Sequence, residues 1–125
     1  MIQRIQTFWL FLVFAIAIGL AHLFQKENIL LIASALTAAL AVVGIIRYKD
    51  RPRQITICYI LIFLEAVTAV VMYLKLVPIV TEGESALISP VWLPIAPVFG
   101  LIFAVLAMTA IKKDEKLVRS MDRLR

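Results

Sequence analysis

Four long apolar runs, separated by short polar segments, make up most of the pattern along the chain. They lie at about 5–24, 29–46, 55–77 and 90–111. Each is close to the ~20 residues that a helix needs to cross the hydrocarbon core of a bilayer. None has the continuous polar face that a helix of a water-soluble bundle exposes. The pattern therefore predicts an all-α membrane protein, a four-transmembrane-helix bundle that forms a single membrane domain over residues 1–125.

The polar segments between the runs indicate how the spans are joined. Residues 25–28 (QKEN) form a short turn in which Asn28 can cap the next helix, so the first two spans are expected to form an antiparallel hairpin. Pro52 disfavours a helix at Arg51, which predicts that residues 50–52 (DRP) end the cytoplasmic extension of the second span. Pro94 and Pro97 predict a bent or irregular start of the fourth helix.

The amino-acid composition excludes a water-soluble domain. Hydrophobic residues make up 63% of the 125 residues, and charged residues only 17%. A soluble fold of this length leaves much of its surface in water and cannot bury so much apolar area. Lipid is therefore the expected solvent of these helices.

Basic residues gather in a few segments, and their distribution predicts the orientation. Eleven of the thirteen lysines and arginines are Arg4, Arg47, Lys49, Arg51, Arg53, Lys112, Lys113, Lys116, Arg119, Arg123 and Arg125. By the positive-inside rule, both termini and the middle connection then face the cytoplasm of a bacterial inner membrane. Four spans also place both termini on one side. The net charge of +5 needs no nucleic-acid partner, and none is expected.

Residues 112–125 differ from the spans and predict an amphipathic helix that extends from the fourth span. Its apolar residues fall on one helical face: Leu117, Val118, Met121 and Leu124. Glu115 precedes Arg119 by four residues, the order that stabilises a helix. Such a helix can lie on the cytoplasmic leaflet with its basic side near anionic headgroups, or it can dock on a protein. The pattern leaves both open.

Small residues recur at four-residue steps in three of the spans, and this spacing lets helices pack closely in lipid. The residues predicted to make such contacts are Ala15, Gly19, Ala35, Ala39, Ala96, Gly100 and Ala104. The contacts can lie within one chain, between copies of the chain or with other subunits. The spacing does not separate these cases.

Glu65, in the stretch LIFLEAVTAV, is the one acidic residue deep inside an apolar run. It lies roughly 15 Å from the cytoplasmic end of its helix, near the middle of a core about 30 Å thick. An unpaired charge is costly there, so we expect a neutral carboxyl that bonds to Thr68 on its own helix or Thr37 on the second span. Glu65 is either a proton- or cation-binding site or a structural hydrogen bond between helices.

No arrangement of catalytic or metal-ligating residues appears in the sequence. It has no pair of carboxylates within a span, no glycine-rich phosphate loop, and no nucleophile at a suitable distance from a base. Cys58 is the single cysteine, so no internal disulfide can form. The lone His22 does not make a metal site. We therefore expect neither an enzyme nor a bound cofactor or metal.

The two ends of the chain carry a family resemblance. Residues 1–7 (MIQRIQT) and 110–125 (AIKKDEKLVRSMDRLR), with KDEKLVRS followed by DRLR, resemble the ends of small four-helix membrane proteins from Bacteroidota. That family is known as domain of unknown function 4293. The resemblance implies a four-span inner-membrane protein with cytoplasmic ends, and it brings no activity. It favours an interaction surface at the ends, made of Arg4, Lys112, Lys113, Asp114, Glu115, Arg119, Asp122, Arg123 and Arg125.

Three functions fit these observations. The first is an accessory or assembly subunit of a larger inner-membrane complex, whose partners are the lipid bilayer and other integral subunits or further copies of the chain. The second is a proton-coupled small-molecule transporter that uses Glu65. Small multidrug transporters are similar in their four short helices and intramembrane glutamate, but theirs lies in the first span. The third is a membrane-surface adaptor that acts through its basic tail. We favour the first because the spans offer few polar groups for a transport path.

Overall fold

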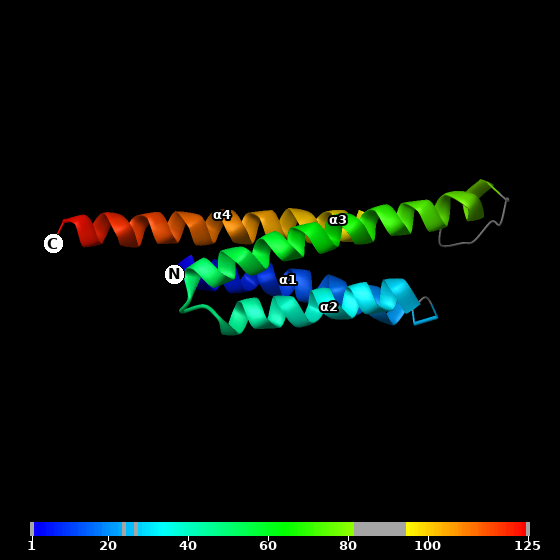
Figure 1. Cartoon of the computed structure of the whole chain (residues 1–125), viewed down its shortest axis with the longest axis horizontal. Coiled ribbons are helices and arrows are strands. Elements are labelled where there is room, and N and C mark those ends of the chain that lie inside the picture. Colours follow the sequence, from blue (N-terminus) through cyan, green and yellow to red (C-terminus); the bar gives the residue numbers. More distant parts are fainter. Residues whose placement is uncertain (1, 24, 27, 82–94, 125) are drawn as a thin grey trace.

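Four α-helices make up the chain in a computed structural model that describes residues 2–23, 25–26, 28–81 and 95–124. They are α1 (Ile2–Leu23), α2 (Asn28–Ile46), α3 (Arg51–Thr81) and α4 (Ile95–Arg123), shown in Figure 1. All four are long and apolar enough to cross a membrane. The predicted all-helical, multi-pass membrane architecture is therefore confirmed.

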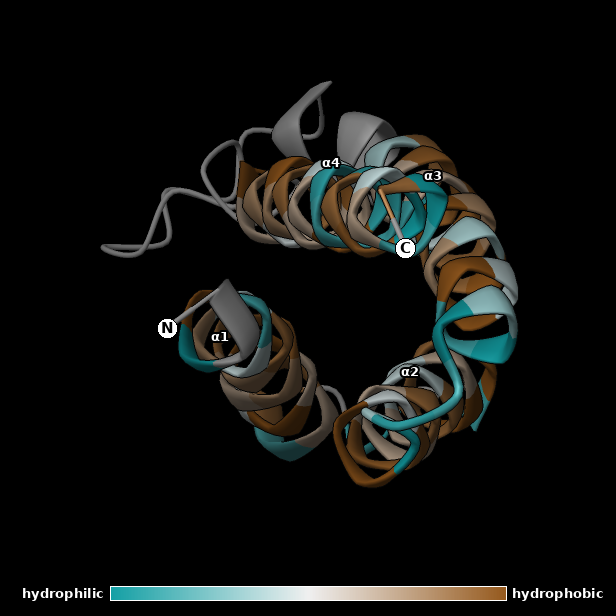
Figure 2. Cartoon of the chain, turned by 90° about the vertical axis from the view of Figure 1, so that its left-hand side faces the viewer, coloured by the Kyte–Doolittle hydropathy of each residue, from teal (hydrophilic) through white to brown (hydrophobic). Residues whose placement is uncertain are grey.

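The helices follow one another around the bundle in chain order. Helix α1 packs against α2 and α4, and α3 packs against α2 and α4. Figure 2 looks along the bundle and shows this cyclic arrangement. The N-terminus, the connection at 47–50 and the C-terminus of α4 lie at one end, which we call the terminal end (Figure 1). Neighbouring helices are therefore antiparallel.

Each helix buries residues at alternating steps of three and four. This spacing is typical of bundles whose helices cross at a shallow angle, because it keeps one narrow stripe of each helix facing its neighbours. The stripes are Gln6, Leu10, Val13, Ala17 and Leu20 in α1; Leu30, Ser34, Thr37, Ala41 and Gly44 in α2; Gln54, Cys58, Leu61, Glu65, Thr68 and Met72 in α3; and Pro97, Gly100, Ala104, Ala107 and Ile111 in α4.

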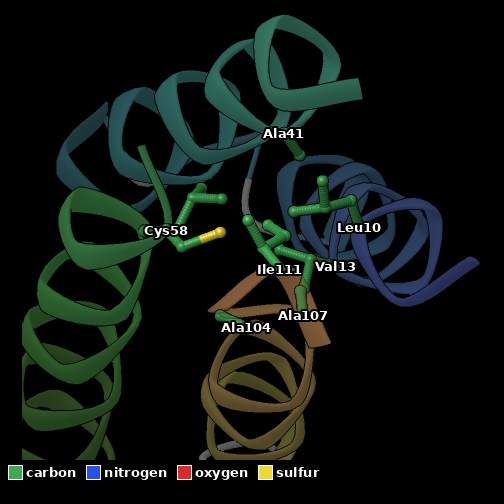
Figure 3. Close-up of a cluster of buried hydrophobic side chains, with 8 residues drawn as sticks. Leu10, Val13, Ala41, Cys58, Ala104, Ala107 and Ile111 are labelled. Atoms are coloured by element: carbon green, nitrogen blue, oxygen red, sulfur yellow. The ribbon is translucent and has the colours of Figure 1, made fainter. Parts of the chain in front are cut away.

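Two apolar clusters fill the interior. The larger lies toward the terminal end and is shown in Figure 3; it consists of Leu10, Val13, Ala41, Cys58, Leu61, Ala104, Ala107 and Ile111. The smaller consists of Leu20, Leu30 and Met72, farther from that end. Between the two clusters, the stripes of α2 and α3 bring polar side chains inside.

Two buried glutamines join neighbouring helices at the terminal end. Gln6 Nε2 donates to the carbonyl oxygen of Ala110 at 3.3 Å, which ties α1 to α4. Gln54 Nε2 donates to the carbonyl oxygen of Gly44 at 3.0 Å, which ties α3 to α2. Gly44 lies in the last turn of α2, where carbonyls have no partner within the helix, so Gln54 satisfies one of them.

The starts of α3 and α4, which both contain a proline, differ from the sequence prediction. Helix α3 already begins at Arg51, and Pro52 lies in its first turn, where the missing N–H costs no intrahelical bond. The Asp50 carbonyl accepts the first bond, from the N–H of Gln54 at 3.0 Å. Helix α4 is regular from Ile95 with Pro97 in its first turn, so the irregular start predicted at Pro97 is not observed. The other proline of that prediction, at position 94, lies outside the described residues.

Candidate functional site

Glu65 lies in the interior stripe of α3 and is 2% exposed. Its carboxyl is packed against Gly100 of α4. A β-carbon built on Gly100 would lie 2.6 Å from Oε1 and 2.7 Å from Cδ of Glu65. The carboxyl therefore fills the space that the missing side chain of Gly100 leaves.

The two threonines predicted to bond with Glu65 are buried but bond elsewhere. Thr37 Oγ1 donates to the carbonyl oxygen of Ala33 at 2.9 Å, and Thr68 Oγ1 donates to that of Leu64 at 2.8 Å. Each hydroxyl thus bonds to its own helix four residues back, a common arrangement for threonine inside a helix. The predicted hydrogen bonds to Glu65 are wrong, and Oε1 has no hydrogen-bond partner among the described residues.

Ser34 of α2 is a polar interior residue that the sequence interpretation missed. It is 3% exposed, and its Oγ has no hydrogen-bond partner in the described part of the chain. A signal was present in the sequence: Ser34 precedes Thr37 by three residues and therefore shares its helical face. Three buried side chains of the described residues thus have an unpartnered oxygen: Ser34 and Glu65 between the two apolar clusters, and Gln54, through its Oε1, at the terminal end.

The predicted small-residue contacts divide into two groups. Gly100 and Ala104 are buried in the stripe of α4, and Ala96 is half-buried. The other predicted contacts, in α1 and α2, lie on the exposed surface of the chain: Ala15, Gly19, Ala35 and Ala39. These four do not pack between helices of this chain, because the interior stripes of α1 and α2 run along other faces of the two helices. Nothing lies within 4 Å of a β-carbon built on Gly19.

The root of the C-terminal part of α4 is held firmly to α3. Arg51 Nε pairs with Asp114 Oδ2 at 3.0 Å. Lys112 Nζ donates to the hydroxyl of Tyr59 at 2.7 Å and lies 4.9 Å from the centre of the Tyr59 ring. Beyond these contacts α4 runs on past the ends of the other three helices (Figure 1). We call residues 115–124 the projecting end of α4.

Two kinds of exposed side chain follow the projecting end. The exposed apolar side chains of this segment are Leu117, Met121 and Leu124, which are 46%, 69% and 89% exposed. Another face carries basic side chains that border a shallow hollow of about 360 Å³, together with Glu115 and Ser120: Lys112, Lys116, Arg119 and Arg123. Glu115 Oε1 accepts a bond from Arg119 Nη2 at 2.8 Å. The remaining cations of this face have no such acid beside them among the described contacts.

The other predicted surface residues are placed as follows. Arg4, Lys113 and Asp122 are exposed, Arg4 on α1 near the terminal end and the other two on α4. Arg125 lies outside the described residues. The structure thus brings most of the predicted interaction surface together at the terminal end, with Asp114 engaged in the ion pair with Arg51.

Metal-ligating side chains do not cluster in the described part of the chain. The described ranges contain no group of three or more histidine, cysteine, aspartate or glutamate residues that could hold a metal ion. Cys58 is buried within the larger apolar cluster, where it packs as a small apolar residue.

Comparison with known proteins identifies a family. The sequence profile of the family described as "Domain of unknown function (DUF4293)" matches residues 20–124. The match includes the tail KDEKLVRS and DRLR and all of α2, α3 and α4, so the resemblance of the sequence to this family is confirmed. No curated protein and no solved structure matches the chain.

Proposed function

The chain belongs to the family described as Domain of unknown function (DUF4293), whose description names no activity, and we propose from the fold and its exposed surfaces that it is an accessory or assembly subunit of a larger bacterial inner-membrane complex. Four helices that can cross a membrane account for almost all of its described residues. Such a chain has little room for a catalytic site of its own. Its free surfaces are lipid-facing spans and the projecting end of α4.

The exposed apolar side chains of the projecting end carry this proposal. Leu117, Met121 and Leu124 are spaced by four and three residues, the spacing with which a helix packs against another helix or into a groove. Helix α4 has 29 residues and is therefore about 43 Å long. A hydrocarbon core is about 30 Å thick, so the projecting end extends into water, where exposed apolar side chains favour a protein partner.

The fixed root of the projecting end supports the same proposal. The Arg51–Asp114 ion pair and the Lys112–Tyr59 hydrogen bond hold α4 against α3 just before the helix leaves the bundle. The projecting end is therefore presented in one direction, which lowers the ordering cost that a partner must overcome on binding. A straight helix also fits this role better than a helix that lies flat on the leaflet.

The proposed orientation places the terminal end in the cytoplasm. Arg47, Lys49, Arg51 and Arg53 lie there together with the basic face of α4, and the positive-inside rule applies to such short connections and to the residues flanking a span. The projecting end would then meet a cytoplasmic domain of the complex.

Site-specific photo-cross-linking tests the proposal in native membranes. A photoreactive amino acid at Met121 is expected to give one dominant cross-linked adduct, with a single other protein. The same amino acid at Phe63, which is exposed on the apolar part of α3, serves as the control and is expected to label lipid. Labelling of lipid alone from Met121 would instead support a membrane-surface adaptor, and the absence of any protein adduct would reject the subunit proposal.

A proton-coupled transporter is the second candidate, and the burial of Glu65 with an unpartnered Oε1 is the observation that favours it. Transport needs polar groups along a path. Apolar clusters lie on both sides of Glu65 in the described interior, and their members include Leu61 and Ala104 on one side and Leu20 and Met72 on the other. This arrangement makes transport the weaker candidate.

A further inference from the structure

We propose that Glu65 and Ser34 bind one water molecule between them in the middle of the bundle, with the Glu65 carboxyl in its neutral form. The ligand is thus a single water molecule, and the Glu65 carboxyl carries its proton. This site is independent of the subunit function proposed above, since it lies inside the bundle and not at the projecting end.

The hydrogen bond between Gln54 and Gly44 is a reference point from which the heights of Ser34 and Glu65 along the bundle axis can be compared. Ser34 lies ten residues before Gly44 in α2, and Glu65 lies eleven residues after Gln54 in the antiparallel α3. At 1.5 Å per residue, both residues lie about 15 to 17 Å from that bond along the bundle. Both also belong to interior stripes of helices that pack against each other. Their unpartnered oxygens therefore occur at the same level.

The Glu65 carboxyl packs against Gly100 of α4, and the Gln6 bond to Ala110 places Ala17 of α1 close to the height of Gly100. Ala17 lies eleven residues after Gln6 in α1, and Gly100 lies ten residues before Ala110 in α4. The level thus contains one large side chain, Glu65, and three small residues. Gly100 accommodates the carboxyl, and the proposed water would lie beside the small side chains of Ala17 and Ser34.

Ser34 differs from the other hydroxyl residues with described bonds. Thr37, Thr56, Thr68, Thr109 and Ser120 each donate to a carbonyl of their own helix. Ser34 is buried and does not. A buried hydroxyl or carboxyl oxygen without a partner destabilises the folded state, because it has lost its hydrogen bonds to water. One water between them would satisfy both, which is the usual role of buried water in proteins.

The neighbouring helices indicate that the carboxyl is neutral. α2 contains no charged residue over Asn28–Ile46, and α4 contains none from Ile95 to Ile111. In α1 the residues from Ile5 to Ala21 are likewise uncharged, and Glu65 is the only acidic or basic residue of α3 between Gln54 and Leu74. No cation faces Glu65 from any helix packed against it, so an ionised carboxylate would be buried without compensation.

A metal cation is a poorer occupant than water. Ca²⁺ takes 6–8 oxygen ligands and Mg²⁺ requires six, whereas the side chains at this level supply only the hydroxyl of Ser34 and the carboxyl of Glu65. Backbone carbonyls in the middle of a helix are already engaged in helical hydrogen bonds. A water molecule needs only two to four partners.

Solid-state NMR of the isotopically labelled full chain in lipid bilayers tests the site. The Glu65 Cδ signal is assigned by its loss in Glu65→Gln. We expect its chemical shift to be that of a carboxylic acid at neutral pH, and its intensity to build up rapidly when polarisation starts from water protons. In Ser34→Ala, which removes a single oxygen atom, the rapid transfer from water should be lost.

Thr37→Ala is the matched control, because Thr37 is equally buried on the same helix but bonds to Ala33. It should leave both the shift and the water transfer of Glu65 unchanged. A carboxylate shift, a neutral carboxyl without transfer from water, or a Ser34→Ala variant that keeps the transfer would each overturn the proposal. The thermal transition of each variant in detergent verifies that the bundle remains folded.

Discussion

The carboxyl of Glu65 on α3 occupies the space in front of Gly100 on α4, where a β-carbon would lie 2.6 Å from Oε1. Real atoms do not approach this closely, so a side chain at position 100 would require the Glu65 carboxyl to leave its present position. The pair sets how closely α3 and α4 approach at the middle of the bundle. In lipid, where close packing drives helix association, this approach contributes directly to stability.

Gly100→Ala is expected to destabilise the bundle by about 1–3 kcal/mol, the usual cost of overpacking an interior. The cost should largely disappear in a Glu65→Ala background, because the atoms that clash are then absent. Thermal unfolding in detergent of the two single variants and the double variant measures this coupling. Gly19→Ala is the control, since a β-carbon at position 19 meets nothing within 4 Å. Additive effects of the two substitutions would contradict the contact.

Glu65→Gln is expected to retain most of the stability, because an amide has nearly the size and polarity of a neutral carboxyl. Glu65→Lys should prevent stable folding, because moving an unpaired cation from water into the middle of the bundle costs several kcal/mol. Glu65→Leu should lie between the two. Yield of folded chain and thermal midpoint in detergent check the order. If Gln and Leu variants both match the unaltered chain in folding, assembly and growth, Glu65 has neither a structural nor a transport role.

The Arg51–Asp114 ion pair is expected to stabilise the root of the projecting end more than the Arg119–Glu115 pair does. The side chains of Arg51 and Asp114 are 27% and 14% exposed, whereas Arg119 is 76% exposed. Exposed pairs contribute about 0.2–1 kcal/mol, and the partly buried pair should lie at the upper end of that range. Two double-mutant cycles compare the pairs: Arg51→Gln with Asp114→Asn, and Arg119→Gln with Glu115→Gln. Equal coupling energies would count against a special role for Arg51.

Met121→Glu is expected to reduce recovery of the partner without lowering the stability of the bundle. Met121 is 69% exposed, so a charge at this position costs nothing in the isolated chain but opposes burial in an apolar contact. Quantitative cross-linking and the thermal midpoint are measured on the same preparation. Lys113→Glu, also exposed on α4, is the control for a general effect of charge. An equal loss of partner recovery in Met121→Glu and Lys113→Glu would indicate that charge attraction, and not apolar docking, holds the partner.

The buried Cys58 provides a test of the orientation. Because this single cysteine is fully buried, the unaltered chain should not react with a maleimide. Lys26→Cys and Lys49→Cys each introduce an exposed thiol at opposite ends of the bundle. With the terminal end in the cytoplasm, an impermeant maleimide should label position 26 in spheroplasts and position 49 only after lysis. The reverse pattern would invert the proposed topology.

The spans could be predicted because one requirement dominates them: a helix that crosses lipid must be apolar along its length. Which face of each helix turns inward was harder to predict. Small residues at four-residue steps pointed to Ala35 and Ala39, yet α2 buries Ser34, Thr37 and Ala41. The alternating three- and four-residue steps of a complete bundle decide this, and they emerge only when all four helices are considered together.

The surroundings of Glu65 show a similar limit. Its depth, its burial and the lack of a cation followed from the position of one acidic residue in an apolar run. The choice of partner did not, because a threonine in a helix can satisfy its hydroxyl on its own backbone. The contact with Gly100 joins residues distant in sequence and depends on the packing of α3 on α4.

The bond from Gln6 to the Ala110 carbonyl connects residues 104 positions apart. During synthesis, therefore, the first helix enters the membrane with a polar amide whose acceptor does not exist until the last helix has been made. A truncated chain that lacks α4 therefore retains an amide on α1 without its carbonyl partner. Disulfide trapping between cysteines at positions 6 and 110 in nascent chains of increasing length would date the closure of the bundle.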